Sequence, residues 1–179
     1  MPKYIAMLRG INVSGQKLIK MADLRTSMAD LGLQNVSTYV QSGNVLFETE
    51  EKDQVKIAKD IESKIKKDFT FDVPCIVRTS LHFKEVIDNN EFVQRGEDEK
   101  RCYVTFLETK PDQGLVKTID QDQYKPEEFK VKEDIIYFYS PNGYGNAKMN
   151  NNFFEQKLKV KATTRNWNSV NKLYELSKS

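Results

Sequence analysis

The sequence predicts an α+β fold built from two ferredoxin-like arrangements, each with the order βαββαβ, and closed by an extra C-terminal helix. Short β-rich apolar runs alternate with amphipathic helical segments, and the same order is found in both halves of the chain. Tight turns at Ser42-Gly43 and Glu133-Asp134 join neighbouring runs, which requires antiparallel strands. The 179 residues, of which 39% are hydrophobic, suffice for one core or for two small ones.

The first half, residues 1–79, is expected to form the first subdomain. Its elements are a strand at residues 4–8, a helix at 21–31, strands at 36–40 and 45–47, a helix at 57–65 and a strand at 73–77. Gly32 supplies the stop of the first helix, and Gly43 with Asn44 tolerates the positive φ of a hairpin turn. Pro74 indicates that the last strand lies at a sheet edge, because proline cannot donate to a strand ladder.

Residues 80–100 are expected to connect the halves, as a short helical segment at 81–87 followed by a charged stretch of low apolarity at 91–100. The second subdomain then spans residues 101–179. Its elements are a strand at 102–107, a helix opened by Pro111 that reaches Ile119, strands at 129–131 and 135–139, a helix at 153–158, a strand at 160–162 and the closing helix at 167–174.

A doubly wound parallel sheet is the alternative architecture for a chain in which strands and helices alternate. Strands joined by tight hairpins are antiparallel neighbours, which that fold seldom provides. The two hairpins therefore favour the α+β arrangement.

Composition indicates an ordinary cytoplasmic protein. No apolar run approaches the roughly 20 residues of a membrane span, and the N-terminus has no signal-peptide pattern, so no contact with a membrane is expected. Cys75 and Cys102 lie in strand-like runs and are expected to be reduced, buried thiols rather than a disulfide. His82 is the only histidine, so a Cys/His zinc site is not expected, and the sequence predicts no metal and no cofactor.

Polar clusters stand where predicted strands end, and they supply the candidate ligand-binding residues. The eight candidates are Arg9, Asn12, Ser42, Asn44, Lys148, Arg165, Asn166 and Asn168. In a βαββαβ unit, the loop that leaves the first strand and the first hairpin emerge at one end of the sheet. The cluster at residues 9–12 should therefore face residues 42–44, and by the same logic residues 142–148 should lie beside residues 163–168. The sequence leaves open whether the clusters form one site, two sites or only structural contacts.

These side chains favour recognition of a small phosphate- or carboxylate-bearing ligand. Thr163 or Thr164 can cap the closing helix, whose N-terminus favours negative charge, and Arg165 can offer a planar, two-pronged donor. Both ends of the chain are also basic: residues 1–25 hold five Lys and Arg against one Asp, and residues 140–179 hold seven against two Glu. If the ends meet in space, they form a basic face that attracts an anion.

No catalytic residue can be assigned, because no serine or cysteine stands with a base in a recognisable arrangement, and whether the protein is an enzyme stays open. Residues 143–148 are similar to a phosphate loop but lack its Gly-Lys-Ser/Thr ending. One alternative is a nucleic-acid-binding module that uses the basic ends and the strand aromatics, although no RNA-recognition motif is present. The other is a structural or protein-interaction domain, in which Trp167 anchors a core and the asparagines hold backbone turns. The oligomeric state is not indicated.

Four segments resemble the hallmark segments of a bacterial family of unknown function, DUF1697. They are residues 8–13 (LRGINV), 20–25 (KMADLR), 38–45 (TYVQSGNV) and 162–168 (ATTRNWN), and the resemblance runs in order from Tyr4 to about Leu176. The resemblance implies a duplicated ferredoxin-like α+β fold and no established activity. The chain departs from the family pattern at Ser14, where glycine is common, and at Ser169, where threonine is usual.

Overall fold

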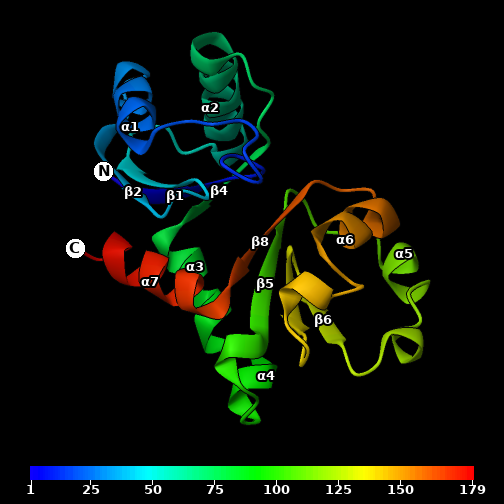
Figure 1. Ribbon diagram of the computed structural model, residues 1–179. Coiled ribbons are helices and arrows are strands. Elements are labelled where there is room, and N and C mark those ends of the chain that lie inside the picture. Colours follow the sequence, from blue (N-terminus) through cyan, green and yellow to red (C-terminus); the bar gives the residue numbers. More distant parts are fainter. The chain divides into compact units, whose positions relative to one another are not determined.

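The computed structural model describes residues 1–179 as seven α-helices and two four-stranded antiparallel sheets (Figure 1). The chain divides into two compact units: unit 1 comprises Met1–Lys84 and Leu173–Ser179, and unit 2 comprises Glu85–Lys172. Helices α3 (Ser80–Asp88) and α7 (Trp167–Ser177) each begin in one unit and end in the other. None of the helices is both long enough and apolar enough to span a membrane.

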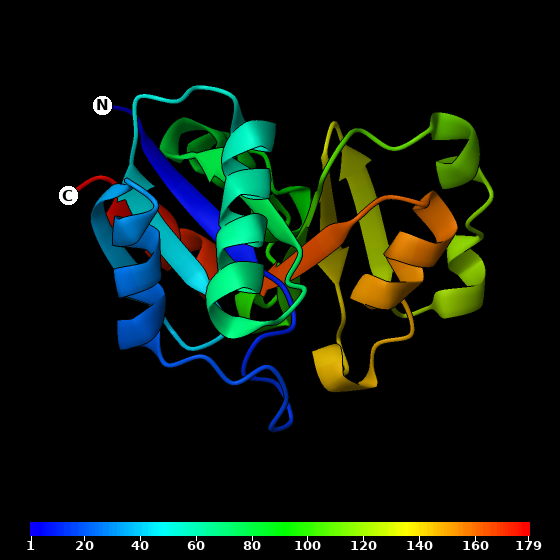
Figure 2. The same ribbon diagram turned by 90° about the horizontal axis from the view of Figure 1, so that it is seen from above.

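Unit 1 has one sheet with two helices on one of its faces. Its elements are β1 (Lys3–Leu8), α1 (Met21–Asp30), β2 (Gln34–Tyr39), β3 (Asn44–Glu48), α2 (Gln54–Phe69) and β4 (Cys75–Thr79). The strand order is β2-β3-β1-β4, and every neighbouring pair is antiparallel. Figures 1 and 2 show α1 and α2 side by side over the sheet. An apolar core that includes Ala6, Val45, Ile61 and Val77 fills the space between these layers.

Helix α2 shows how the sequence sets the ends and the buried face of a helix. The side chain of Asp53 accepts hydrogen bonds from the N–H groups of Val55 (3.0 Å) and Lys56 (3.2 Å), which caps the N-terminus. One stripe of the helix is buried, and it consists of Ile57, Ala58, Ile61 and Ile65. The helix ends at Thr70, which takes a left-handed φ of 66°.

The opposite face of the unit 1 sheet is also buried. Its apolar side chains are at most 6% exposed, and they are Ile5, Met7, Leu46 and Ile76. The end of α7 lies by this face: Leu176 and Leu46 line the same small hollow, and Ser177 Oγ lies 2.6 Å from Ser80 Oγ. Burial on both faces explains why β1 is a continuous apolar run rather than an alternating one.

Unit 2 contains the second sheet, with the strand order β6-β7-β5-β8 and antiparallel neighbours throughout. Its elements are α4 (Glu91–Gln94), β5 (Cys102–Leu107), α5 (Gln113–Lys117), β6 (Glu128–Lys132), β7 (Ile135–Tyr139), α6 (Asn151–Leu158) and β8 (Ala162–Asn166), with 3-10 turns at Glu99–Arg101, Gln121–Tyr124 and Tyr144–Asn146. Helices α5 and α6 cover one face of this sheet, where Leu115 and Leu158 join its core. Strand for strand, the order in unit 2 is that of unit 1.

The core of unit 2 is built around aromatic rings. Phe138 is fully buried, and its ring centroid lies 6.1 Å from the centroids of Tyr103 and Phe154 and 6.3 Å from that of Tyr144. Tilted and edge-on rings at these separations attract one another beyond the gain from burial. The cluster therefore ties β5, β7, α6 and the Tyr144–Asn146 turn together.

Most of the predicted elements are present. Both hairpins form, and all neighbouring strands are antiparallel, which excludes the doubly wound alternative. Strand β4 begins directly after Pro74 and lies at the edge of its sheet, as that proline indicated.

Three segments differ from the prediction. The last strand was expected at residues 160–162 but runs from Ala162 to Asn166, so it includes most of the polar cluster. The charged connector contains α4 and the Glu99–Arg101 turn. The helix expected from Pro111 begins only at Gln113, because the Asp112 side chain caps it by accepting from Gly114 N–H (2.7 Å).

Candidate functional site

The polar loop after β1 and the β2–β3 hairpin lie together in unit 1, as their place in the fold predicts. Asn12 Nδ2 donates to the carbonyl oxygens of Ile19 (3.0 Å) and Gln41 (2.8 Å), while Asn12 Oδ1 accepts from Ile19 N–H (2.8 Å). The backbone of Leu8 donates to Gly43 O (2.8 Å). The Asn12 amide therefore uses these hydrogen bonds to hold the loop against the hairpin.

The hairpin side chains also bond to the backbone around them. Asn44 is fully buried, and its Nδ2 donates to Tyr39 O (3.0 Å) and to Ser42 Oγ (3.3 Å). Arg9 is half-buried at the end of β1, and its backbone N–H donates to Pro74 O (3.0 Å). The hydrogen bonds of Asn12, Ser42 and Asn44 are those of a braced loop and turn.

In unit 2, the polar residues of β8 divide between the two faces of the sheet. Side chains alternate along a strand, so Thr163 and Arg165 share one face while Thr164 and Asn166 share the other. Arg165 is 9% exposed, and its Nη1 donates to Thr163 Oγ1 (2.8 Å) and to Thr164 O (3.1 Å). The guanidinium thus bonds along its own strand, on the face away from Asn166.

Helix α7 begins directly after β8 and is capped by Asn166. Asn166 Oδ1 accepts from Ser169 N–H at 2.8 Å, which is the role that the sequence assigned to Thr163 or Thr164. Both threonines lie within the strand instead, and Thr164 Oγ1 lies 2.8 Å from Thr105 Oγ1. The expected threonine cap is therefore wrong, because the strand runs four residues further than its apolar part.

A pocket of about 520 Å³ opens where β8 passes into α7. It lies within unit 2, and its lining residues are Glu99, Lys100, Tyr103, Asn166, Trp167, Asn168 and Asn171. The pairing of Tyr103 with Asn166 across β5 and β8 brings the Glu99–Arg101 turn next to the start of α7. Two of the eight predicted residues, Asn166 and Asn168, therefore line one pocket.

The pocket combines flat apolar surfaces with hydrogen-bonding groups. Tyr103 is half-buried and Trp167 is 5% exposed, so each is held by the core and supplies an aromatic ring to the wall. Asn168 is exposed, and Asn171 is fixed by its Nδ2, which donates to Trp167 O (2.8 Å) and leaves Oδ1 as an acceptor. Lys100 and Glu99 add one charge of each sign, and the N-terminus of α7 adds partial positive charge.

Lys148 lies away from this pocket. The N–H groups of Lys148 and Met149 donate to the carboxylate of Glu127, at distances of 2.9 to 3.1 Å, just before β6. Strands β6 and β8 are the two outer strands of the sheet. The segment at residues 142–148 approaches the pocket through Tyr144, whose ring lies 5.0 Å from that of Tyr103.

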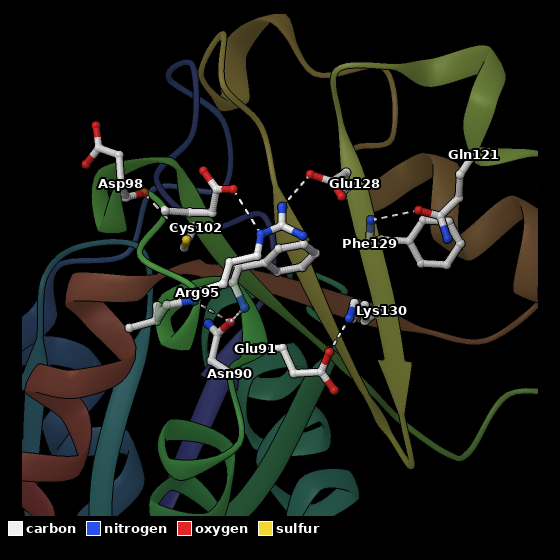
Figure 3. Close-up of polar contacts among 12 residues, drawn as sticks. Asn90, Glu91, Arg95, Asp98, Cys102, Gln121, Glu128, Phe129 and Lys130 are labelled. Atoms are coloured by element: carbon white, nitrogen blue, oxygen red, sulfur yellow. Dashed lines mark hydrogen bonds and ion pairs between the residues drawn. The ribbon is translucent and has the colours of Figure 1, made fainter.

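Cys102 is buried at the start of β5, and Cys75 is buried in β4; both are free thiols, as predicted. Burial raises the pKa of the Cys102 thiol to about 11, and the carboxylates of Glu97 and Glu99 add to the rise. The sulfur lies 3.5 Å from Asp98 O (Figure 3). Because the thiolate is the reactive form of cysteine, Cys102 is not an activated nucleophile.

We expect Cys102 to be alkylated slowly by iodoacetamide at pH 8, and the stability of the protein to fall above pH 9. An unfolded cysteine ionises near pH 8.5, whereas the folded thiol stays protonated to about pH 11. Between these values the unfolded state binds fewer protons, so stability decreases as the pH rises. Between pH 8 and pH 10, the free energy of unfolding measured with urea should fall less for Cys102→Ala than for the unsubstituted protein. Equal losses would contradict this assignment.

The fold and the pocket define a class: an α+β protein with two four-stranded antiparallel sheets and a small surface pocket. The family model described as "Protein of unknown function (DUF1697)" matches residues 1–137, and the chain belongs to this family. The matched region contains the first three hallmark segments. Ser14, in the loop after the first hallmark segment, takes a left-handed φ of 52°.

The chain is similar over its whole length to a solved structure. That structure is "the structure of conserved bacterial protein SP0830 from Streptococcus pneumoniae", with a TM-score of 0.78 and 22% sequence identity, and the similarity covers 100% of this chain and 99% of that chain. At this identity the likeness shows the fold. No curated protein matches the sequence.

Proposed function

We propose that the protein binds a small ligand with a planar ring and a phosphate or carboxylate group in the pocket at the start of α7. One observation carries the proposal: two aromatic residues, three asparagines, a lysine and a glutamate line one hollow of about 520 Å³ beside a helix N-terminus. Ligand pockets typically pair apolar walls with a few polar groups that fix orientation.

Each wall of the pocket has a role in this proposal. Tyr103, which is half-buried, stacks against the ring, whereas Trp167, at 5% exposed, adds only a small contact area. The amide of Asn168 donates to the anionic group, Lys100 adds a counter-charge, and Asn171 Oδ1 accepts from a ring N–H. Glu99 lowers the net positive charge of the pocket, so the pocket suits a ligand with one anionic group better than a ligand with several.

The pocket contains the only tryptophan of the chain, so binding can be followed directly. We expect Trp167 fluorescence to change on titration with nucleoside monophosphates or aromatic carboxylates. Loss of the Asn168 bond to an anion should weaken binding by roughly 10- to 150-fold in Asn168→Ala, because such a bond contributes roughly 1.5 to 3 kcal/mol. Lys100→Ala should weaken it similarly.

Gln156→Ala is the matched control, because it removes an exposed amide from α6, outside the pocket. Its affinity should equal that of the unsubstituted protein. The proposal fails if no ligand of the panel alters the fluorescence, or if the affinity is the same for all three variants.

Burial of most strand aromatics favours a small ligand over nucleic acid. Tyr4, Phe106 and Tyr137 are at most 4% exposed and serve the cores. Tyr103 and Tyr139 are half-buried but lie on opposite faces of their sheet, so the strand aromatics form no row on which successive bases could stack. The free, buried cysteines suit the reducing cytoplasm, which we propose as the compartment.

We also infer that the two sheets are a ferredoxin-like duplication, with subdomains at residues 1–79 and 101–179 joined by residues 80–100, although the last seven residues, Leu173–Ser179, pack with unit 1. The support is the identical strand order in both sheets and the element order βαββαβ in each.

A further inference from the structure

Strand β6 is an outer strand of the unit 2 sheet, and a groove of about 580 Å³ follows its free edge. The groove is bounded by α5 and the Gln121–Tyr124 turn on one side and by Asn89 and Glu91 on the other. Pocket and groove belong to opposite outer strands of one sheet, so the groove is a separate feature.

Backbone N–H and C=O groups of β6 point into this groove. Phe129 N–H donates to Gln121 Oε1 (3.2 Å), so it points away from β7 (Figure 3). In an antiparallel pair, the inward and outward directions alternate with each residue. Val131, two residues on, therefore presents its N–H and its C=O to the groove, while Lys130 bonds to β7.

The two walls of the groove differ in chemistry. Phe129 and Val131 project to the side of α5, where Val116 and Ile119 also line the groove. Lys130 and Lys132 project to the other side. Figure 3 shows Lys130 paired with Glu91, and Lys132 Nζ donates to Asn89 Oδ1 (2.9 Å).

The groove is also positively charged. Its charged lining residues are three lysines and one glutamate, namely Lys117, Lys130, Lys132 and Glu91. Glu91 pairs with Lys130 and also interacts electrostatically with Lys132, so the lining keeps an excess of two positive charges. Acidic side chains of a partner would complete the arrangement.

We propose that this edge binds an extended peptide in which acidic and apolar residues alternate. The peptide adds a fifth strand beside β6, bonding to Val131 N–H and C=O and to Phe129 C=O. Its apolar side chains enter the wall formed with Val116 and Ile119, and its carboxylates lie on the other face, where they meet Lys132. Successive side chains of a strand point to opposite faces. A peptide that presents apolar side chains to one wall and carboxylates to the other must therefore alternate the two kinds of residue.

Charge argues against a second copy of β6 as the occupant. A two-fold pairing centred on Val131 leaves the Gln121 bond intact, but it places Lys130 of each copy opposite Lys132 of the other. A pairing centred on Phe129 would set Glu128 opposite Lys130, yet it needs the Phe129 N–H that Gln121 occupies. An acidic peptide avoids both the repulsion between lysines and the need for the Phe129 N–H.

The test uses the whole protein and a fluorescein-labelled six-residue peptide of alternating glutamate and valine. Fluorescence polarisation should show binding that weakens with added salt, and a peptide of alternating lysine and valine should bind at least tenfold more weakly. Lys132→Glu should reduce the affinity for the acidic peptide at least fivefold. Lys161→Glu makes the same change of charge at an exposed position outside the groove and should leave the affinity unchanged.

Val131→Pro removes the edge N–H at a position where an outer strand tolerates proline, and it should reduce the affinity at least tenfold, more than Val131→Ala. If Val131→Pro does not fold, hydrogen exchange on the unsubstituted protein decides: the peptide should slow exchange at Val131 and leave Lys130 unchanged. Equal binding of both peptides, an unprotected Val131, or self-association that Val131→Pro abolishes would overturn the proposal.

Discussion

Phe138→Ala is expected to lower the free energy of unfolding of unit 2 by about 3 to 5 kcal/mol, the range for truncating a buried phenylalanine. The side chain is fully buried and contacts the rings of Tyr103, Tyr144 and Phe154. Its removal leaves a cavity and breaks the aromatic contacts of three neighbours at once. We therefore expect a value near the top of that range.

Urea unfolding monitored by circular dichroism would measure the loss. Phe138→Leu is the matched control: it keeps most of the volume and should cost about 1 kcal/mol. A loss below 1 kcal/mol in Phe138→Ala would show that this cluster does not organise the core.

Gly43→Ala is the second large effect, and it acts on unit 1. A Cβ at this position would lie 2.8 Å from Leu8 Cβ and 2.8 Å from Ile11 Cδ1, and the residue has a φ of +93°. A left-handed backbone costs a residue with a Cβ about 1 to 2 kcal/mol, and overpacking costs about 1 to 3 kcal/mol more. We expect a total loss of about 2 to 5 kcal/mol, because both neighbours are buried.

Gly96→Ala separates these two contributions. Gly96 has a φ of +90°, but nothing lies within 4 Å of its added Cβ. It should therefore show the backbone cost alone. Equal losses at the two glycines, measured by urea unfolding, would mean that the hairpin moves freely away from the loop at residues 8–11.

The sequence predicted the elements whose signals are local. β1 was visible because five consecutive apolar residues are typical of a buried strand, and the hairpins were visible because their turns contain Ser42-Gly43 and Glu133-Asp134. β8 was truncated because its later residues, Thr163 to Asn166, are polar on both faces and give no apolar alternation. The β-propensity of the two threonines was the available signal. Helix α4 was missed although Asn90, its cap, stands before Glu91.

The candidate site was only partly accessible to sequence reasoning. Asn166 and Asn168 were identified because amides crowd around the only tryptophan. Lys100 and Tyr103 were missed because they reach the pocket through the pairing of β5 with β8, and nothing near them in the sequence indicates that register. The roles of Asn12 and Asn44 also depend on distant backbone, since an asparagine that braces a loop and one that binds a ligand look alike in a sequence.

The passage of α7 from unit 2 into unit 1 affects how a nascent chain can fold. A ribosome makes all of Glu85–Lys172 before it makes Leu173–Ser179, the segment that completes unit 1. Unit 2 is continuous and can fold as it emerges. Most of unit 1 is synthesised before unit 2, but its last seven residues, Leu173–Ser179, are synthesised after unit 2. While unit 2 is being made, the apolar surface of unit 1 that these seven residues cover therefore stays exposed. The order of translation and the order of completion are therefore opposite in this protein.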